Sequence, residues 1–106
     1  MALGATLHRY ALRIEDVERG VYADVEVRLA RHASESDGYF VARLLAFALA
    51  YEDGLAFSGG GLSDVDEPAI ARRDLVGRIL TWIEIGEPSP ERLHRASKRA
   101  DEVVIY

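Results

Sequence analysis

The chain has 106 residues, of which 49% are hydrophobic, so it is long enough for one core and too short for two domains. It contains no cysteine, which excludes disulfide bonds and thiolate metal sites. Its formal net charge of −5 excludes nucleic-acid binding by overall charge alone, but a local basic face is still compatible with it.

The sequence shows no signal for a membrane. Its start, MALGATLHRY, lacks the basic segment and long apolar run of a signal peptide. Its longest apolar stretch, residues 44–51, is far too short to span a bilayer. We therefore expect a soluble, cytoplasmic protein with no membrane partner.

The first part of the chain has the pattern of a β-hairpin. Residues 5–15 and 21–29 alternate between apolar and polar side chains, and IEDVERG forms the connection between them. One face of this hairpin is expected to pack on a core while the other meets water. The apolar face of the second strand consists of Val21, Ala23, Val25, Val27 and Leu29.

The next segment predicts a buried helix. HASESDG supplies residues that begin helices, with Ser34 or Ser36 as the N-cap. From Tyr39 to Tyr51 only Arg43 interrupts the apolar run, and Gly54 is well placed to end the helix. A helix that is apolar on all sides is expected to be buried on all sides.

The second half predicts several strands and one more helix. Strands are expected at 55–57, 68–74 and 78–85, and a final strand at VVIY. Ser89 and Pro90 begin the helix before it, because proline is tolerated at the first helical position. The expected order is β-β-α-β-β-β-α-β, with one parallel pair across the last helix. The predicted fold class is α/β or α+β, a mixed sheet with flanking helices.

Residues 78–85 are apolar on both faces, which is typical of a central strand. Simple alternation places Ile79, Ile83 and Ile85 on one face, and Leu80 and Trp82 on the other. Trp82 is therefore expected to lie in the core rather than to serve as a platform for stacked bases.

Carboxylates gather at one end of the predicted 68–85 hairpin. Asp64, Asp66 and Glu67 precede its first strand, and Glu84 and Glu87 lie at the end of its second. With the turn centred on residues 75–76, Glu84 lies opposite Glu67. Two like charges at such positions destabilise a sheet, so this end of the hairpin needs a compensating cation or contact with solvent.

Two interpretations of these carboxylates stay open. Glu84 has apolar neighbours, and a Mg²⁺ or Mn²⁺ ion held by Asp66, Glu67 and Glu84 would compensate the buried charge. Alternatively, the carboxylates form a solvated rim, or Glu84 pairs with an arginine, either Arg43 or Arg95.

The second predicted helix carries a row of cations. Leu93, Ala96 and Ala100 form its apolar seam, and the cations lie on a different stripe. This stripe is either a phosphate-contacting face or an ordinary solvated one. It consists of Arg92, Arg95, Lys98 and Arg99.

Several segments together resemble one family of bacterial proteins. LARHASESDGYFVARLLAFAL, LSDVDEPAI, WIEIGEPSPERLHRAS and RADEVVIY resemble the YaeQ family, and the resemblance runs through nearly the whole chain. Members of that family are longer and continue past the strand that matches VVIY. The resemblance therefore implies a single YaeQ-like domain over residues 1–106 that lacks the C-terminal part of the family.

The resemblance implies a fold similar to the PD-(D/E)XK nucleases, the restriction-endonuclease-like fold, whose core order is αβββαβ. The order expected over residues 36–106 agrees with it, preceded by the hairpin. In such nucleases an aspartate begins the second core strand, which corresponds here to Asp66 or Glu67. The acidic residue of the third strand corresponds to Glu84. The acid that the first helix sometimes contributes corresponds to Glu35 or to no residue of this chain.

One residue departs from the nuclease pattern. Gly86 stands where the lysine of the motif is expected, and Arg95 and Lys98 on the following helix are the candidates to replace it. The resemblance thus leaves two functions. One is Mg²⁺-dependent phosphodiester hydrolysis of nucleic acid, with Asp66 and Glu84 on the metal and Arg95 or Lys98 on the phosphate. The other is an inactive nuclease-like scaffold that binds nucleic acid or a protein.

Overall fold

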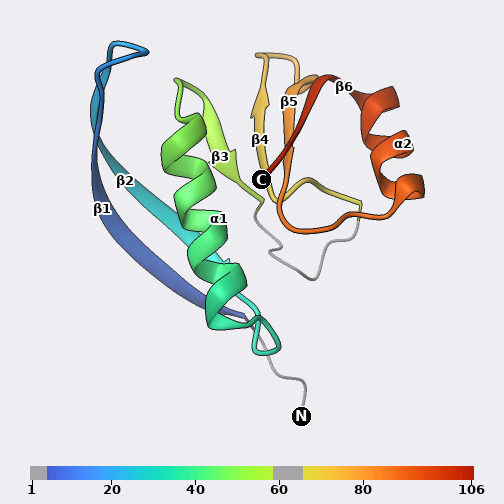
Figure 1. Cartoon of the computed structure of the whole chain (residues 1–106), viewed down its shortest axis with the longest axis horizontal. Coiled ribbons are helices and arrows are strands. Elements are labelled where there is room, and N and C mark those ends of the chain that lie inside the picture. Colours follow the sequence, from blue (N-terminus) through green and yellow to red (C-terminus); the bar gives the residue numbers. More distant parts are fainter. Residues whose placement is uncertain (1–4, 59–65) are drawn as a thin grey trace.

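The computed structural model describes residues 5–58 and 66–106, which form a mixed α+β fold of two sheets and two helices (Figure 1). The predicted element order is confirmed. The elements are β1 (Thr6–Asp16), β2 (Val21–Arg31), α1 (Asp37–Ala50), β3 (Leu55–Phe57), β4 (Ile70–Arg73), β5 (Ile79–Glu84), α2 (Pro90–Arg99) and β6 (Ala100–Ile105). Of the helices in this described part, none has the length and apolar character that crossing a membrane requires.

Strands β1 and β2 form the predicted hairpin as a two-stranded sheet of their own. They pair antiparallel over their full lengths, from Thr6 opposite Arg31 to Asp16 opposite Val21. The turn closes at Gly20, whose φ of 68° favours glycine. Alternate residues face α1, and Val27 and Leu29 are buried there with the helix side chains. In Figure 1 the long hairpin curves along one side of α1.

Helix α1 begins where the sequence indicates but is buried on one side only. Ser36 is the N-cap, and its side chain accepts a hydrogen bond from the backbone N–H of Tyr39. The helix ends at Ala50, before Gly54, which lies instead in the turn that leads to β3. The prediction of burial on all sides is wrong, since Leu45 is 57% exposed. Within the described residues the core lies on one side of the helix, so its opposite apolar stripe, Val41, Leu45 and Leu49, faces outward.

The second sheet has the strand order β3-β4-β5-β6. Strand β5 lies between antiparallel β4 and parallel β6, which confirms both the central strand and the parallel pair. One face packs against α1 and the hairpin through Ile70 and Ile83. The other face packs against α2, where Trp82 and Ala96 are buried together. Helix α2 and its residues therefore lie on the side of β5 opposite α1 (Figure 1).

The register of β4 and β5 differs from the prediction. Ile70 pairs with Ile83, and continuing that register places Ala69, not Glu67, opposite Glu84. The turn that sets this register spans 74–78, where Gly77 has a φ of 90°. The two like charges of Glu67 and Glu84 therefore do not face each other across the ladder.

A bulge in β5 also changes which face Ile79 occupies. Arg72 pairs with Thr81 and Arg73 with Ile79, so Leu80 is an extra residue in β5. Ile79 consequently packs with Trp82 on the α2 side, while Ile83 and Ile85 pack on the α1 side. The predicted common face for the three isoleucines is wrong because one extra residue reverses the alternation.

Candidate functional site

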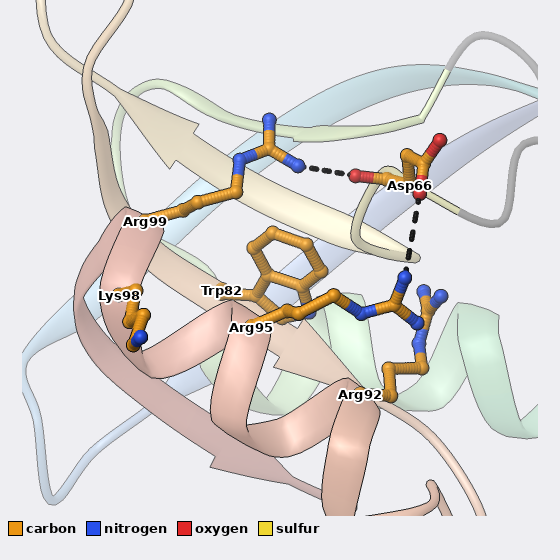
Figure 2. A pocket seen from close by; sticks show the side chains of 6 residues that line it. All are labelled: Asp66, Trp82, Arg92, Arg95, Lys98 and Arg99. Carbon is orange, nitrogen blue, oxygen red and sulfur yellow. Dashed lines mark hydrogen bonds and ion pairs between the residues drawn. The ribbon is translucent and has the colours of Figure 1, made fainter.

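A pocket of about 280 Å³ lies between α2 and the face of the second sheet that α2 covers (Figure 2). Ser89 caps α2 by accepting a hydrogen bond from the N–H of Arg92, with Pro90 as the first helical residue. In the helix that begins there, side chains three or four residues apart lie on the same side. The pocket is lined by Asp66, Trp82, Arg92, Arg95, Lys98 and Arg99.

Trp82 is the apolar base of this pocket. Its side chain is only 2% exposed and packs with Ala96 of α2, which confirms the expected core position. The guanidinium carbons of Arg92 and Arg99 lie 5.8 and 5.3 Å from the centre of its ring system. Both distances are within the range of cation–π attraction. The tryptophan therefore belongs to the core and also positions two of the four cations.

Glu84 lies beside Trp82, and its carboxylate is already engaged. The indole N–H of Trp82 donates to Glu84 Oε1 at 2.6 Å, and Arg92 Nε donates to the same oxygen at 2.7 Å. The expected pairing of Glu84 with Arg43 or Arg95 is wrong, because Arg92 in the first turn of α2 reaches it instead. A buried carboxylate held by a guanidinium and an N–H is compensated without a metal.

Asp66 and Glu67 lie on the rim, in the segment that leads to β4. The Glu67 carboxylate contacts Arg73 Nη2 at 2.5 Å and Arg99 Nη2 at 3.5 Å. The Asp66 carboxylate lies near α2, with Oδ1 3.8 Å from Arg95 Nη1. Its backbone carbonyl accepts a hydrogen bond from Arg99. Asp64, a further acid of the predicted cluster, lies outside the described residues.

The donor set, as arranged, does not fit Mg²⁺ or Mn²⁺. Among residues 5–58 and 66–106, no three histidine or carboxylate side chains come together as a metal site would need. Glu67 and Glu84 are both bound by arginines, and Arg95 and Lys98 add further positive charge to the pocket. Among the lining residues that the structure describes, four are cations and one is a carboxylate, which favours binding of an anion over binding of a metal cation. The metal site at Asp66, Glu67 and Glu84 stays a prediction.

Glu35, the expected acid of the first helix, belongs to a separate buried ion pair. It lies just before α1, and its two oxygens accept hydrogen bonds from Arg43 at 2.8 and 2.9 Å. The charges of this pair and of the pair of Glu84 and Arg92 both affect the pKa of Tyr39. Burial raises the pKa of Tyr39 above its usual value, and Glu84 and Glu35 raise this pKa further. The positive charges of Arg43 and Arg92 act in the opposite direction and lower the pKa of Tyr39.

Sequence reasoning identified the cations of α2 but not their partners. From the sequence, Arg43 and Arg95 are the possible partners of Glu84, whereas the observed partner is Arg92, eight residues further along the chain than Glu84. The signal that favours Arg92 is its place in the first turn after Ser89 and Pro90, where α2 returns over β5. This position indicates that α2 packs over β5, but it does not indicate which arginine comes within hydrogen-bond distance of Glu84.

Comparison with known proteins decides the family. A sequence model of the YaeQ protein family matches residues 1–106, the whole of the chain. The chain belongs to the YaeQ family. Relatives within this family include the uncharacterised YaeQ proteins of Escherichia coli K12, 35% identical over 106 residues, and of Salmonella typhi, 37% identical over 107 residues. The chain spans 58% of the length of each of these two YaeQ proteins.

Solved YaeQ structures share the same fold. The crystal structure of the YaeQ protein from Pseudomonas syringae is 44% identical and superposes with a TM-score of 0.89. The YaeQ protein from Xanthomonas axonopodis pv. citri is also 44% identical, with a TM-score of 0.88. Each match covers 95% of this chain and 56% of the solved one. The described fold is therefore the fold of the corresponding part of the longer YaeQ proteins.

Proposed function

We propose that this YaeQ-family chain binds the phosphate backbone of nucleic acid through Arg92, Arg95, Lys98 and Arg99, hereafter the α2 cations. In this proposal the nuclease-like scaffold binds nucleic acid and does not cleave it. The observation that carries it is the state of Glu84. Its carboxylate is buried and bound by Arg92, while three further cations line the same pocket.

The α2 cations suit phosphate for chemical reasons. A guanidinium presents a planar set of N–H donors that matches phosphate oxygens, and a lysine adds a point charge. Arg95, Lys98 and Arg99 are exposed, so a polyanion can reach them. They follow one another along a single helix, which is a common arrangement for contacts with a nucleic-acid backbone. The net charge of −5 does not oppose this, because a local field attracts the ligand.

The proposed scaffold type rests on the order and packing of the elements. From α1 to β6 the order is αβββαβ, with β5 and β6 parallel and the two helices on opposite faces of the sheet. This agrees with the core order of the PD-(D/E)XK nucleases. We propose the arrangement as a restriction-endonuclease-like core that follows an N-terminal hairpin. A fold of this kind carries no activity by itself.

Binding of nucleic acid is expected to depend on the α2 cations and on salt. The measurement is fluorescence anisotropy with labelled single- and double-stranded DNA and RNA in low salt. The triple variant Arg95→Gln, Lys98→Gln, Arg99→Gln is expected to bind at least about tenfold more weakly. Its log–log salt slope is expected to fall by about one for each phosphate that the variant no longer neutralises.

The hairpin supplies a control with the same change in charge. Arg9, Arg13 and Arg28 are exposed on strands β1 and β2. Replacing all three by glutamine removes three charges away from the pocket, and binding is expected to stay within about twofold of wild type. Equal losses in the two triple variants would show a general effect of charge. No nucleic-acid binding by the wild type would overturn the proposal and favour a protein partner.

Metal-dependent hydrolysis is the second candidate, and one observation favours it. The Asp66 carboxylate is exposed at the rim of the pocket whose base, Trp82, contacts Glu84. For these two carboxylates to hold a metal together, Arg92 has to leave Glu84.

Calorimetric titration with Mn²⁺ separates the two candidates. We expect no binding at millimolar Mn²⁺ by the wild type, by Glu84→Gln or by the control Glu26→Gln on the hairpin. Binding by the wild type and the control that is lost in Glu84→Gln would establish the metal site. It would also justify a screen for cleavage of DNA and RNA.

A further inference from the structure

Arg99 combines contact with an aromatic ring and contact with solvent. Its guanidinium carbon is 5.3 Å from the centre of the Trp82 ring system, within the range of cation–π attraction. The side chain is nevertheless 44% exposed. Arg92 also lies over Trp82, but its side chain is only 22% exposed and binds Glu84. Arg99 is therefore the arginine over Trp82 that a ligand can readily reach.

Several contacts hold the Arg99 guanidinium in place. Trp82 lies on one side of it, Nη1 donates to the backbone carbonyl of Asp66, and Nη2 lies 3.5 Å from Glu67 Oε1. Figure 2 shows the side chain reaching from the end of α2 above Trp82 toward Asp66. A guanidinium is planar, so with a ring on one side and acceptors at its edge, the side away from Trp82 is the part that a ligand can approach.

An unpaired nucleobase suits such a surface. Guanidinium planes are among the groups on which the splayed bases of single strands stack. The pocket volume of about 280 Å³ lies just below the range of sites for drug-sized ligands, about 300–1,000 Å³, so it suits one small planar group. Inside a duplex each base is covered by its neighbours, and exposing one costs unstacking and unpairing energy.

We propose that an unpaired nucleobase stacks on the Arg99 guanidinium while Arg95 and Lys98 contact the adjacent phosphates. The site thereby binds single-stranded nucleic acid in preference to a duplex. This inference rests on the proposed function, because it takes the ligand of the α2 cations to be nucleic acid. It adds that one of these cations recognises a base as well as a charge.

The first measurement is the affinity of the wild type for three labelled ligands in low salt by fluorescence anisotropy. The ligands are a single-stranded oligonucleotide, the blunt duplex of the same sequence, and an abasic strand of the same length. The single strand is expected to bind at least about fivefold more tightly than either of the others, as stacking of one base allows. Equal affinity for all three ligands would overturn the inference.

Arg99→Lys tests the guanidinium plane, because lysine keeps the positive charge but has no planar group to stack on. The variant is expected to bind the single strand at least about fivefold more weakly than wild type. Its affinity for the abasic strand and its salt slope are expected to stay unchanged, since the charge is retained. Equal losses for the intact and the abasic strand would show that Arg99 contacts phosphate alone, which would also overturn the inference.

Arg95→Lys is the matched control, one turn earlier on α2. The Arg95 side chain is 61% exposed and pairs with Asp66. Any effect of this variant is expected to be the same for the single strand, the duplex and the abasic strand, because Arg95 contacts phosphate in all three. A selective loss of single-strand binding in Arg95→Lys but not in Arg99→Lys would assign the stacking to the wrong arginine.

The inference and the proposed function fail in different ways. If the wild type binds single strand and duplex equally, and the triple variant of the α2 cations loses both, the cations bind the phosphate backbone without stacking a base. If the wild type binds none of the three ligands, both are wrong.

Discussion

Replacing Arg43 by methionine is expected to lower the free energy of unfolding by about 3–5 kcal/mol, as loss of one partner from a buried ion pair does. The Arg43 and Glu35 side chains are 1% and 0% exposed. Arg43 binds both oxygens of Glu35, and its Nη2 also donates to the Ala30 carbonyl at 2.8 Å. Methionine fills part of the space but leaves the Glu35 carboxylate buried without its cation. A loss of this size is a large share of the stability of a small domain.

Urea denaturation measures this loss, and a double variant identifies its cause. Glu35→Gln together with Arg43→Met removes both charges and is expected to recover part of the loss. The exposed pair of Arg13 and Asp24 is the control, because Arg13→Met is expected to cost about 1 kcal/mol or less. A cost for Arg43→Met no larger than that for Arg13→Met would contradict the prediction.

Replacing Trp82 by alanine is expected to lower the free energy of unfolding by about 3–5 kcal/mol, because it leaves a cavity in the core. Trp82 is buried between β5 and α2, and its indole N–H donates to Glu84. The variant also removes the aromatic surface beneath Arg92 and Arg99. Nucleic-acid binding is therefore expected to weaken even at temperatures at which the variant stays folded.

Trp82→Phe separates packing from the hydrogen bond. Phenylalanine keeps an aromatic ring under the two arginines but leaves Glu84 without the indole donor. We expect Trp82→Phe to lower the free energy of unfolding by roughly 1–3 kcal/mol. We also expect it to bind nucleic acid more tightly than Trp82→Ala does. Urea denaturation and anisotropy measure the two quantities. Equal stability of Trp82→Ala and wild type would show that this side of the sheet is not a packed core.

The elements and their order could be predicted from the sequence, because the signals involved are local. Period-two alternation identified the hairpin strands, and Ser36 and Ser89 cap the two helices as their sequence contexts indicate. The apolar run of β5 on both faces was enough to place it centrally. The motifs that resemble the YaeQ family were sufficient to name the family, which the comparison confirmed.

Which side chains face outward and which charged residues pair could not be predicted, because both depend on the packing of elements that are distant in the sequence. Apart from Arg43, residues 39–51 are apolar on every side, so the pattern could not indicate that Leu45 faces outward. Its exposure depends on which elements cover α1. Ile79 lies on the face opposite to the predicted one because Leu80 is an extra residue in β5. Several arginines could have compensated Glu84, and Arg92 does so because the path of the chain after β5 brings it within hydrogen-bond distance. Attraction between charges depends on their separation in space, which residue type and spacing along the chain do not fix.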